Sequence, residues 1–441
     1  MIQKIMEGNN RSTPRRPFAL PFYYGWFIIG LSFFAYLAAS AVRSAPSVLI
    51  HPLEREFGWG RTAISSAASL NLLTYGLMAP IGGWLLDRYG ARRVVVGSLA
   101  TIAIGVTGTV FVTELWHFIL LWGVVLGIAT GVTPALSASV ASRWFIARRG
   151  LALGILTNAN ATGQVIFLPI LMALIVSRGW RPAMMLIVAT ALLLLPAVWV
   201  WLRDYPSEVG LEPFTDSTTT VEQRNQARAV PRAFSFAALG DAIKSPTFWL
   251  LSGSFFVCGM TSNGLVGTHM IPHAIERGIP EVAAATAVGI MGVASFIGTM
   301  FAGWLCDRID ARKVLSAAYL FRGLSLFVLP YVTDSSSLFV FAILYGFDWF
   351  ATGPSTVALI AKHFGQDRVG VLFGLVFVSH QIGSAIAALG AGWIYSEYGA
   401  YYYAFVSGAV MALLAAGMAM MIRRDRDNAP AQAILVEVAR A

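Results

Sequence analysis

Twelve long apolar runs constrain the fold of this chain more than any other feature. A bilayer core of about 30 Å is crossed by a helix of about 20 apolar residues. The sequence is 57% hydrophobic and only 12% charged, about half the charge of a typical soluble domain. The sequence therefore predicts an all-α membrane protein with twelve transmembrane helices, at residues 24–50, 62–86, 93–112, 116–143, 150–176, 181–202, 247–275, 281–305, 313–332, 336–363, 369–395 and 399–422.

A charged turn occurs at the same place in each half of the chain. GWLLDRYGARR, Gly83–Arg93, follows the second run, and GWLCDRIDARK, Gly303–Lys313, follows the eighth, 220 residues later. The same offset relates Pro134 to Pro354. Because repetition at one fixed period indicates duplicated structural units, we expect two pseudo-symmetric six-helix bundles.

The runs and the cations together predict the domain boundaries and the topology. We expect an N-terminal segment 1–23, a bundle 24–202, a linker 203–246, a second bundle 247–422 and a tail 423–441. Of the 31 lysines and arginines, 24 fall on the side of the N-terminus and five on the opposite side. Cytoplasmic loops carry an excess of cations, so the N- and C-termini and the linker are predicted to be cytoplasmic. The first apolar run is too long for a signal peptide, which favours an uncleaved first span.

The repeated turn and several shorter motifs carry a family resemblance. The pattern G-x-x-x-D-R-x-G-x-R-R at Gly83–Arg93 is similar to a signature of the major facilitator superfamily, and the resemblance extends over essentially the whole chain. It implies the major facilitator fold and a secondary active transporter that works by alternating access. The first half further resembles the bacterial monocarboxylate and oxalate–formate branch, which implies a small organic anion taken up with a proton. The residues that carry this second resemblance are Tyr24-Gly25-Trp26, Arg43, Glu54-x-Glu56-Phe57-Gly58-Trp59, Arg61, Arg143-Trp144-Phe145 and Arg148-Arg149-Gly150.

The two charged turns are candidate gates. A carboxylate that faces the positive N-terminus of a helix contributes up to about 2 kcal/mol when partly buried. The resemblance implies that Asp87 faces the eleventh span near Val369, in a contact that breaks when the cytoplasmic side opens. The alternative is that these charges only hold a tight turn and fix topology. Asp310 replaces the glycine of the second turn, where a positive φ would be strained, so we expect a weaker second gate. The gating candidates are Asp87, Arg88, Arg92, Asp307, Arg308 and Arg312.

Polar side chains deep in the spans are the substrate-binding candidates, because such residues are costly in a membrane and mark functional sites. Arg43 is a fork for a substrate carboxylate or, alternatively, a side chain that snorkels to the outer interface. Corresponding spans of two pseudo-symmetric halves line the central site of such transporters. On this basis the further candidates are Asn160, Gln164, Asn263, His380 and Gln381. For Asn160 and His380 the alternative role is an interhelix hydrogen bond.

Arg322 and Asp348 lie near mid-depth on consecutive spans, where we expect a structural ion pair. If Asp348 instead faces the cavity, it becomes the proton-coupling candidate, because a desolvated carboxylate can titrate near neutrality. His380 is the second candidate for proton coupling.

One departure from the family pattern leaves a second function open. Members that bind small carboxylates carry an arginine in the eighth span, where this chain has Thr299. Aromatic residues such as Trp26, Tyr36, Trp349 and Phe377 could line a less polar site. The alternative function is therefore export of amphipathic organic compounds. A transporter-like sensor is disfavoured because only a short tail follows Arg426.

Several classes of protein are not supported by the sequence. It contains no phosphate-binding Gly-rich loop, no H-E-x-x-H metal motif and no G-x-S-x-G nucleophile motif. We therefore expect no enzyme, no cofactor and no metal. The cations are spread over short loops, whereas nucleic-acid binding needs a clustered basic face. The expected partners are a small-molecule substrate and the lipid bilayer of the inner (cytoplasmic) membrane, and the protein is expected to be a monomer.

Overall fold

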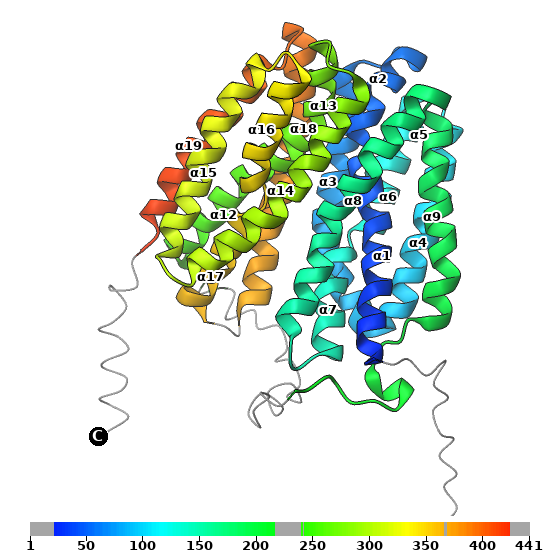
Figure 1. Cartoon of the computed structure of the whole chain (residues 1–441), viewed down its shortest axis with the longest axis vertical. Coiled ribbons are helices and arrows are strands. Elements are labelled where there is room, and N and C mark those ends of the chain that lie inside the picture. Colours follow the sequence, from blue (N-terminus) through cyan, green and yellow to red (C-terminus); the bar gives the residue numbers. More distant parts are fainter. Residues whose placement is uncertain (1–21, 217–239, 241, 366–367, 424–441) are drawn as a thin grey trace, which may run out of the picture.

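The computed structural model describes residues 22–216, 240, 242–365 and 368–423. Within these residues, twelve helices are long and apolar enough to cross a membrane, which confirms the predicted number of spans. They form two six-helix bundles that lie side by side in Figure 1, the first in blue to green and the second in yellow-green to red.

The first bundle holds spans one to six. Span one is α1 (Tyr24–Ser44) continued by α2 (Pro46–Phe57), and span four is α5 (Leu115–Phe118), η1 (Ile119–Val125), α6 (Leu126–Thr130) and α7 (Thr133–Trp144). The other four spans are α3 (Arg61–Tyr89), α4 (Ala91–Val110), α8 (Arg149–Arg178) and α9 (Trp180–Trp201), and a short turn η2 (Pro206–Val209) follows. The break between α1 and α2 and the break between α6 and α7 each precede a proline in the first turn of the next helix, Pro46 and Pro134. A proline there leaves no intrahelical bond unmade, although it lacks an N–H.

The second bundle holds spans seven to twelve. Span seven is α12 (Pro246–Gly259), η3 (Met260–Val266) and α13 (Gly267–Glu276), and span ten is α16 (Ser335–Asp348) followed by α17 (Thr352–Phe364). Span nine is α15 (Ala311–Val328) with η4 (Leu329–Tyr331). The remaining spans are α14 (Glu281–Cys306), α18 (Val369–Tyr398) and α19 (Tyr402–Met421).

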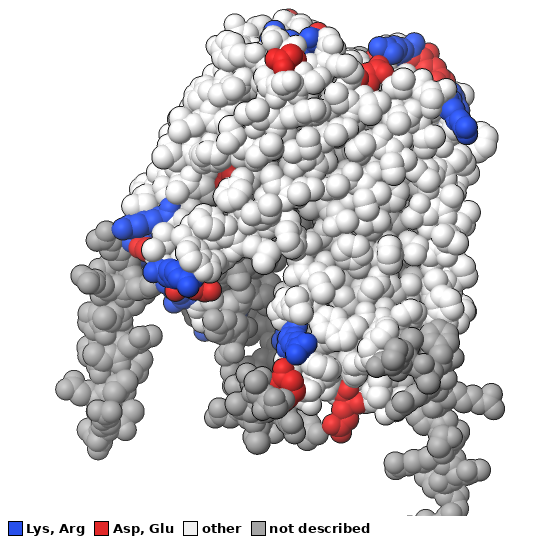
Figure 2. Space-filling model, viewed as in Figure 1, with Lys and Arg blue, Asp and Glu red and all other residues white. Residues whose placement is uncertain are grey.

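The two bundles pack closely at one end of the molecule only. We name the ends after the two charged residues near the ends of α3, the Arg61 end and the Asp87 end. From the Arg61 end to its middle, α3 packs on α18. The hydroxyl of Ser69 donates to the carbonyl of Ala385 at 2.7 Å, and a Cβ at Gly76 would lie 2.4 Å from Cβ of Gln381. Toward the Asp87 end the bundles part, as Figure 2 shows at the bottom of the view.

The two charged turns are capped by carboxylates that come from different parts of the chain. In the first turn Gly90 has φ of +83°, and Oδ1 of Asp204, beyond span six, accepts from the backbone N of Arg92 at 2.9 Å. In the second turn Asp310 has φ of −58°, and its own Oδ1 accepts from the backbone N of Arg312 at 3.0 Å. The strained positive φ considered for Asp310 is therefore absent, because this side chain caps α15 itself.

Candidate functional site

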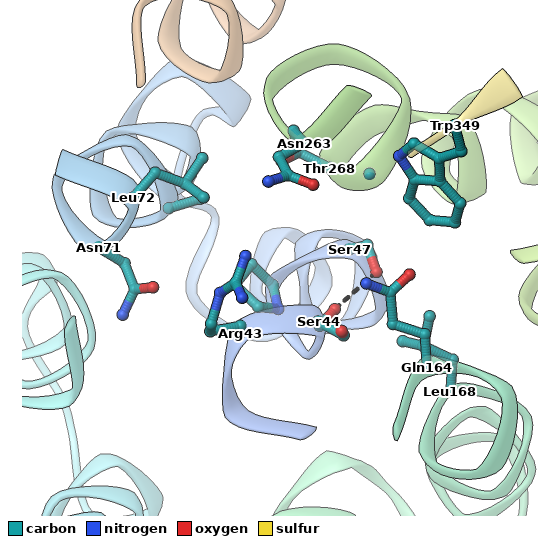
Figure 3. A pocket seen from close by; sticks show the side chains of 13 residues that line it. Arg43, Ser44, Ser47, Asn71, Leu72, Gln164, Leu168, Asn263, Thr268 and Trp349 are labelled. Atoms are coloured by element: carbon teal, nitrogen blue, oxygen red, sulfur yellow. Dashed lines mark hydrogen bonds between the residues drawn. The ribbon is translucent and has the colours of Figure 1, made fainter. Parts of the chain in front are cut away.

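A small cavity of about 30 Å³ lies between the two bundles, with room for one or two water molecules. Arg43, Ser47 and Gln164 reach it from the first bundle, and Asn263, Thr268 and Trp349 reach it from the second (Figure 3). Its lining is therefore mixed, with hydrogen-bonding groups on both sides. Nowhere in the described ranges do three or more His, Cys, Asp or Glu side chains gather in a way that could hold a metal ion.

Arg43 is the one charged side chain among the described residues that line the cavity. Its Nη1 donates to Oδ1 of Asn160 at 3.1 Å and to the hydroxyl of Tyr75 at 3.2 Å. The guanidinium carbon also lies 4.0 Å from the centre of the Tyr75 ring, a cation–π distance. Within the described part of the chain, Arg43 forms no ion pair with a carboxylate, and its buried Nε has no hydrogen-bond partner. Its charge is thus held in place by neutral groups and left uncompensated.

Close contact between α1 and α8 places Asn160 beside Arg43. The hydroxyl of Ser40 donates to the carbonyl of Asn160 at 2.8 Å. One turn further along α8, a Cβ at Gly163 would lie 2.6 Å from Oγ of Ser40, so only glycine permits this approach. Gln164 follows directly and lines the cavity. The structure therefore brings Arg43, Asn160 and Gln164 to one place.

Asn263, which is 220 residues after Arg43, lines the same cavity from the second bundle. It lies in η3, a π-helical segment of span seven, and such segments are frequent at functional sites. Glycines on both sides of it allow η3 to touch α18: a Cβ at Gly259 or at Gly264 would lie within 2.4 Å of a carbonyl oxygen of α18. Two repeat-related positions thus face each other across the bundle interface.

His380 and Gln381 lie on α18 at the bundle interface, but they do not line the cavity. The His380 ring packs between Phe255 and Phe377, with ring centres 4.8 and 5.8 Å away. Nδ1 of His380 and both amide atoms of Gln381 are buried and have no hydrogen-bond partner within the described residues. These polar atoms are close to the site and are available for new partners when the interface changes.

The structure brings Arg322 and Asp348 together inside the second bundle. Nε of Arg322 donates to Oδ2 of Asp348 at 2.6 Å, and its Nη2 donates to the carbonyls of Asp348 and Trp349. The two side chains are 0% and 3% exposed, and neither lines the cavity. Their position matches the expected structural pair, while a proton-coupling role for Asp348 stays a prediction.

The gating candidates do not join the two bundles in this conformation. Asp87 is 80% exposed and accepts a hydrogen bond from Arg143 of its own bundle at 2.8 Å. The contact implied between Asp87 and the start of span eleven requires a closed Asp87 end and stays a prediction. Arg88 and Arg308 lie over the rings of Trp84 and Trp304. Asp307 caps the C-terminus of α14, while Arg92 lies over Trp199 and Arg312 pairs with Asp310.

The structure shows a charged cluster of Arg61, Glu54 and Glu276 at the Arg61 end, which the sequence did not predict. Arg61, which is 4% exposed, forms a two-pronged ion pair with Glu54 at 2.7 Å for each hydrogen bond. Its Nη1 also pairs with Glu276 of the second bundle and donates to the hydroxyl of Tyr401 at 3.1 Å. Glu54 and Arg61 stood out only as part of a family motif, and nothing in the sequence links either to Glu276.

Comparisons with known proteins agree with this architecture. A model described as Major Facilitator Superfamily matches residues 32–298 and 258–438. The chain is 26% identical to "Uncharacterized MFS-type transporter YcxA" of Bacillus subtilis (strain 168) over 83% of this chain and 87% of that one. It is 25% identical to human "Monocarboxylate transporter 11" over 79% of this chain and 80% of that one.

Among solved structures, a bacterial homolog of the human lysosomal transporter Spinster, described as inward-facing and unoccupied, superposes with a TM-score of 0.72 at 15% identity. The superposition covers 93% of this chain and 98% of that one. At this identity the likeness concerns the fold alone.

Proposed function

Because the chain belongs to the Major Facilitator Superfamily and is a transporter of that fold, we propose that it takes up a small organic anion of the monocarboxylate type together with a proton. Transport would proceed by alternating access around the cavity between the two bundles. The relatives named monocarboxylate transporters support the substrate class. The superfamily membership supports the mechanism.

The single observation that carries the substrate class is the uncompensated charge of Arg43. The buried arginines of the described residues are all paired with carboxylates: Arg61 with two glutamates, Arg312 with Asp310 and Arg322 with Asp348. Arg43 instead keeps Nη2 and the unpartnered Nε for a ligand. A planar guanidinium suits two-pronged binding of a carboxylate, and such charge-assisted bonds are about twice as strong as neutral ones.

We assign the remaining candidates roles around this ion pair. Asn160 and Tyr75 orient the guanidinium, while Gln164 and Asn263 contact the body of the substrate. His380 and Gln381 supply further hydrogen-bonding groups once the interface loosens, and Asp87 closes the Asp87 end against span eleven. A cavity of about 30 Å³ is too small for an organic anion, so substrate entry requires the bundles to part further at this level.

The cation count supports a cytoplasmic Asp87 end, because 24 of the 31 cations fall on that side. On this assignment the conformation described here is open to the cytoplasm and closed outside. The superposable Spinster homolog is likewise described as inward-facing. We propose that the protein acts as a monomer in the inner membrane, since one chain holds both bundles and the site between them.

A second candidate function is export of amphipathic organic compounds. The observation in its favour is aromatic: the rings of Tyr75, Phe377 and His380 form a continuous series beside Arg43. Thr299 also leaves the eighth span without the second cation of the small-carboxylate pattern. Such a site would hold a larger, less polar molecule.

Thermal unfolding of the purified protein with a panel of small carboxylates and amphipathic compounds tests these proposals. A ligand at 100 times its dissociation constant stabilises the folded state by about 2.7 kcal/mol. We expect carboxylates to raise the melting temperature of the wild type and of Arg178→Gln, an exposed arginine at the Arg61 end, but not of Arg43→Gln. Stabilisation by amphipathic compounds alone would support export and contradict uptake of a carboxylate.

A further inference from the structure

The Arg61 end is held shut by charged contacts between the bundles. In the described part of the chain, two ion pairs cross the interface: Arg61 with Glu276, and Arg55 with Glu281. The second pair is long, at 3.7 Å, and its arginine is 72% exposed, so it contributes little. Arg61 by contrast is 4% exposed and lies 3.7 Å from the ring centre of Tyr395. The link between Arg61 and Glu276 is therefore the main charged closure of this end.

This cluster holds more negative than positive charge. Glu54 and Glu276 share a single guanidinium, that of Arg61. Two carboxylates near one cation in a partly buried place are unfavourable when both are ionised. The cluster is therefore a natural place to bind one proton.

The two glutamates are not held equally. Both oxygens of Glu54 accept from Arg61, at 2.7 Å each, and His51 lies 3.4 Å from its Oε2. Glu276 accepts from a single nitrogen of Arg61, Nη1, and from the hydroxyl of Tyr395, and that Nη1 also donates to the hydroxyl of Tyr401. The carboxylate with fewer bonds to the guanidinium is thus the one that joins the two bundles.

Both ring nitrogens of His269, a titratable group beside Tyr401, already have partners. Nε2 of His269 lies 2.8 Å from the carbonyl of Ala388 and must donate to it. Nδ1 of the neutral ring then accepts from the hydroxyl of Tyr401, at 3.1 Å. The hydroxyl hydrogen of Tyr401 is therefore used in the bond to His269 and is not available to Glu276. The titratable or charged groups that face this region from the packed elements are His51 and Glu54 of α2, Arg61 of α3, His269, His273 and Arg277 of α13, Glu281 of α14, Tyr395 of α18, and Tyr401.

We propose that Glu276 is the proton-binding residue of the transport cycle and that its protonation releases the Arg61 end. The proposal rests on the proposed uptake function, which needs a proton site reached from outside. Asp348 and His380, the coupling candidates taken from the sequence, are both buried, with 3% and 5% of their surface exposed. Glu276 differs from them because its bond crosses the interface and its side chain reaches solvent at the Arg61 end.

The step itself is a proton transfer without other chemistry. A hydronium or other acid on the Arg61 side gives its proton to a carboxylate oxygen of Glu276, which becomes a neutral acid. The ion pair with Nη1 of Arg61 is lost, while Arg61 keeps its two bonds to Glu54. The cluster becomes neutral overall, and the bundles lose their main charged link at this end. Deprotonation restores the link and closes the end again.

Spin-label distance measurements across the Arg61 end test this proposal in the full-length protein in lipid nanodiscs. Labels at Thr113→Cys and Thr333→Cys occupy exposed, repeat-related loop positions on the two bundles, with the partly exposed Cys306 replaced by alanine. Between about pH 8 and pH 5 the wild type should shift from short to long distances, by up to about tenfold in population ratio per pH unit for one proton. Glu276→Gln should favour the long distance at every pH.

The matched control is Glu281→Gln, which removes the other ion pair at the same end and should keep the pH dependence of the wild type. The proposal would be overturned if the distance between the labels in the wild type did not change with pH. It would also be overturned if the distance in Glu276→Gln changed with pH as in the wild type. If Glu276→Gln does not fold, Glu276→Asp replaces it. That variant keeps a titratable group and should show the response with a shifted midpoint, whereas an unshifted midpoint would also overturn the proposal.

Ligand binding separates this proposal from the proposed function. Glu276 lies outside the cavity, so carboxylates should raise the melting temperature of Glu276→Gln as they do for the wild type. If no carboxylate stabilises the wild type while the distance still responds to pH through Glu276, the uptake function fails and the proton site stands. If carboxylates bind but the distance does not respond, only the proton site fails.

Discussion

Nη1 of Arg43 on span one donates to the side-chain oxygen of Asn160 on span five, 3.1 Å away. This bond ties the one charged side chain that lines the described cavity to a helix whose own position depends on the contact between Gly163 and Ser40. We therefore expect Asn160 to affect ligand binding through Arg43.

Replacing Asn160 by alanine should weaken carboxylate binding without abolishing it. A hydrogen bond to a charged group contributes about 1.5–3 kcal/mol, so we expect a loss of affinity of about tenfold or more in a thermal-shift titration. Asn158→Ala is the control, because the side-chain amide of Asn158 donates to the carbonyl of Gly154 within the same helix. Equal losses in both variants would remove Asn160 from the site.

Breaking the ion pair between Arg322 and Asp348 should strongly destabilise the second bundle. Removal of one partner of a buried pair leaves an uncompensated charge and costs about 3–5 kcal/mol. We expect Arg322→Ala to lower the free energy of unfolding by this amount, and the double variant Arg322→Met with Asp348→Leu to recover most of it. Arg308→Ala, which changes an exposed side chain over Trp304, should stay within about 0.5 kcal/mol of the wild type.

A methyl group at position 76 should open the Arg61 end. A Cβ there would lie 2.4 Å from Cβ of Gln381, a contact that exists only while α3 packs on α18. Gly76→Ala should therefore shift the distance between labels at positions 113 and 333 toward longer values. Gly374→Ala on α18, where a Cβ would meet nothing within 4 Å, should leave that distance unchanged. A shift of the same size in the control would contradict a steric effect of the methyl group at position 76.

Acid should destabilise the second charged turn through Asp310. Its hydrogen bonds with Arg312 hold the pKa of the Asp310 carboxyl below its ordinary value. Since the folded-state pKa is depressed, this stabilisation is present above the ordinary value of about 4 and is lost as the pH falls through the folded-state value. Asp310→Asn keeps a capping side chain and removes the titration. Its melting temperature should fall less steeply than that of the wild type below about pH 4, and parallel curves would contradict this account.

The architecture could be predicted because its signals do not depend on how the helices pack against one another. Apolar length alone gave twelve spans, and a single offset of 220 residues gave two related bundles. The depth of Arg322 and Asp348 on consecutive spans was also enough to suggest their pairing. The first and third signals lie within a helix or between consecutive helices, and the second lies in the repetition of the sequence itself.

The partners of the other polar side chains depend on how distant helices are shifted and rotated against each other. The sequence marked Arg43, Asn160 and Asn263 as unusual. Only the packing of span one on span five and the π-helical turn of η3 place Arg43 and Asn263 at one cavity, with Asn160 bonded to Arg43. It gave no sign that Glu276 would meet Arg61, or that Asp204 would cap the turn at Gly90. Hydrophobic length is a property of each segment by itself, whereas a hydrogen bond between helices requires agreement within a few tenths of an ångström. That agreement is reached only when side chains and glycines of the whole molecule have packed.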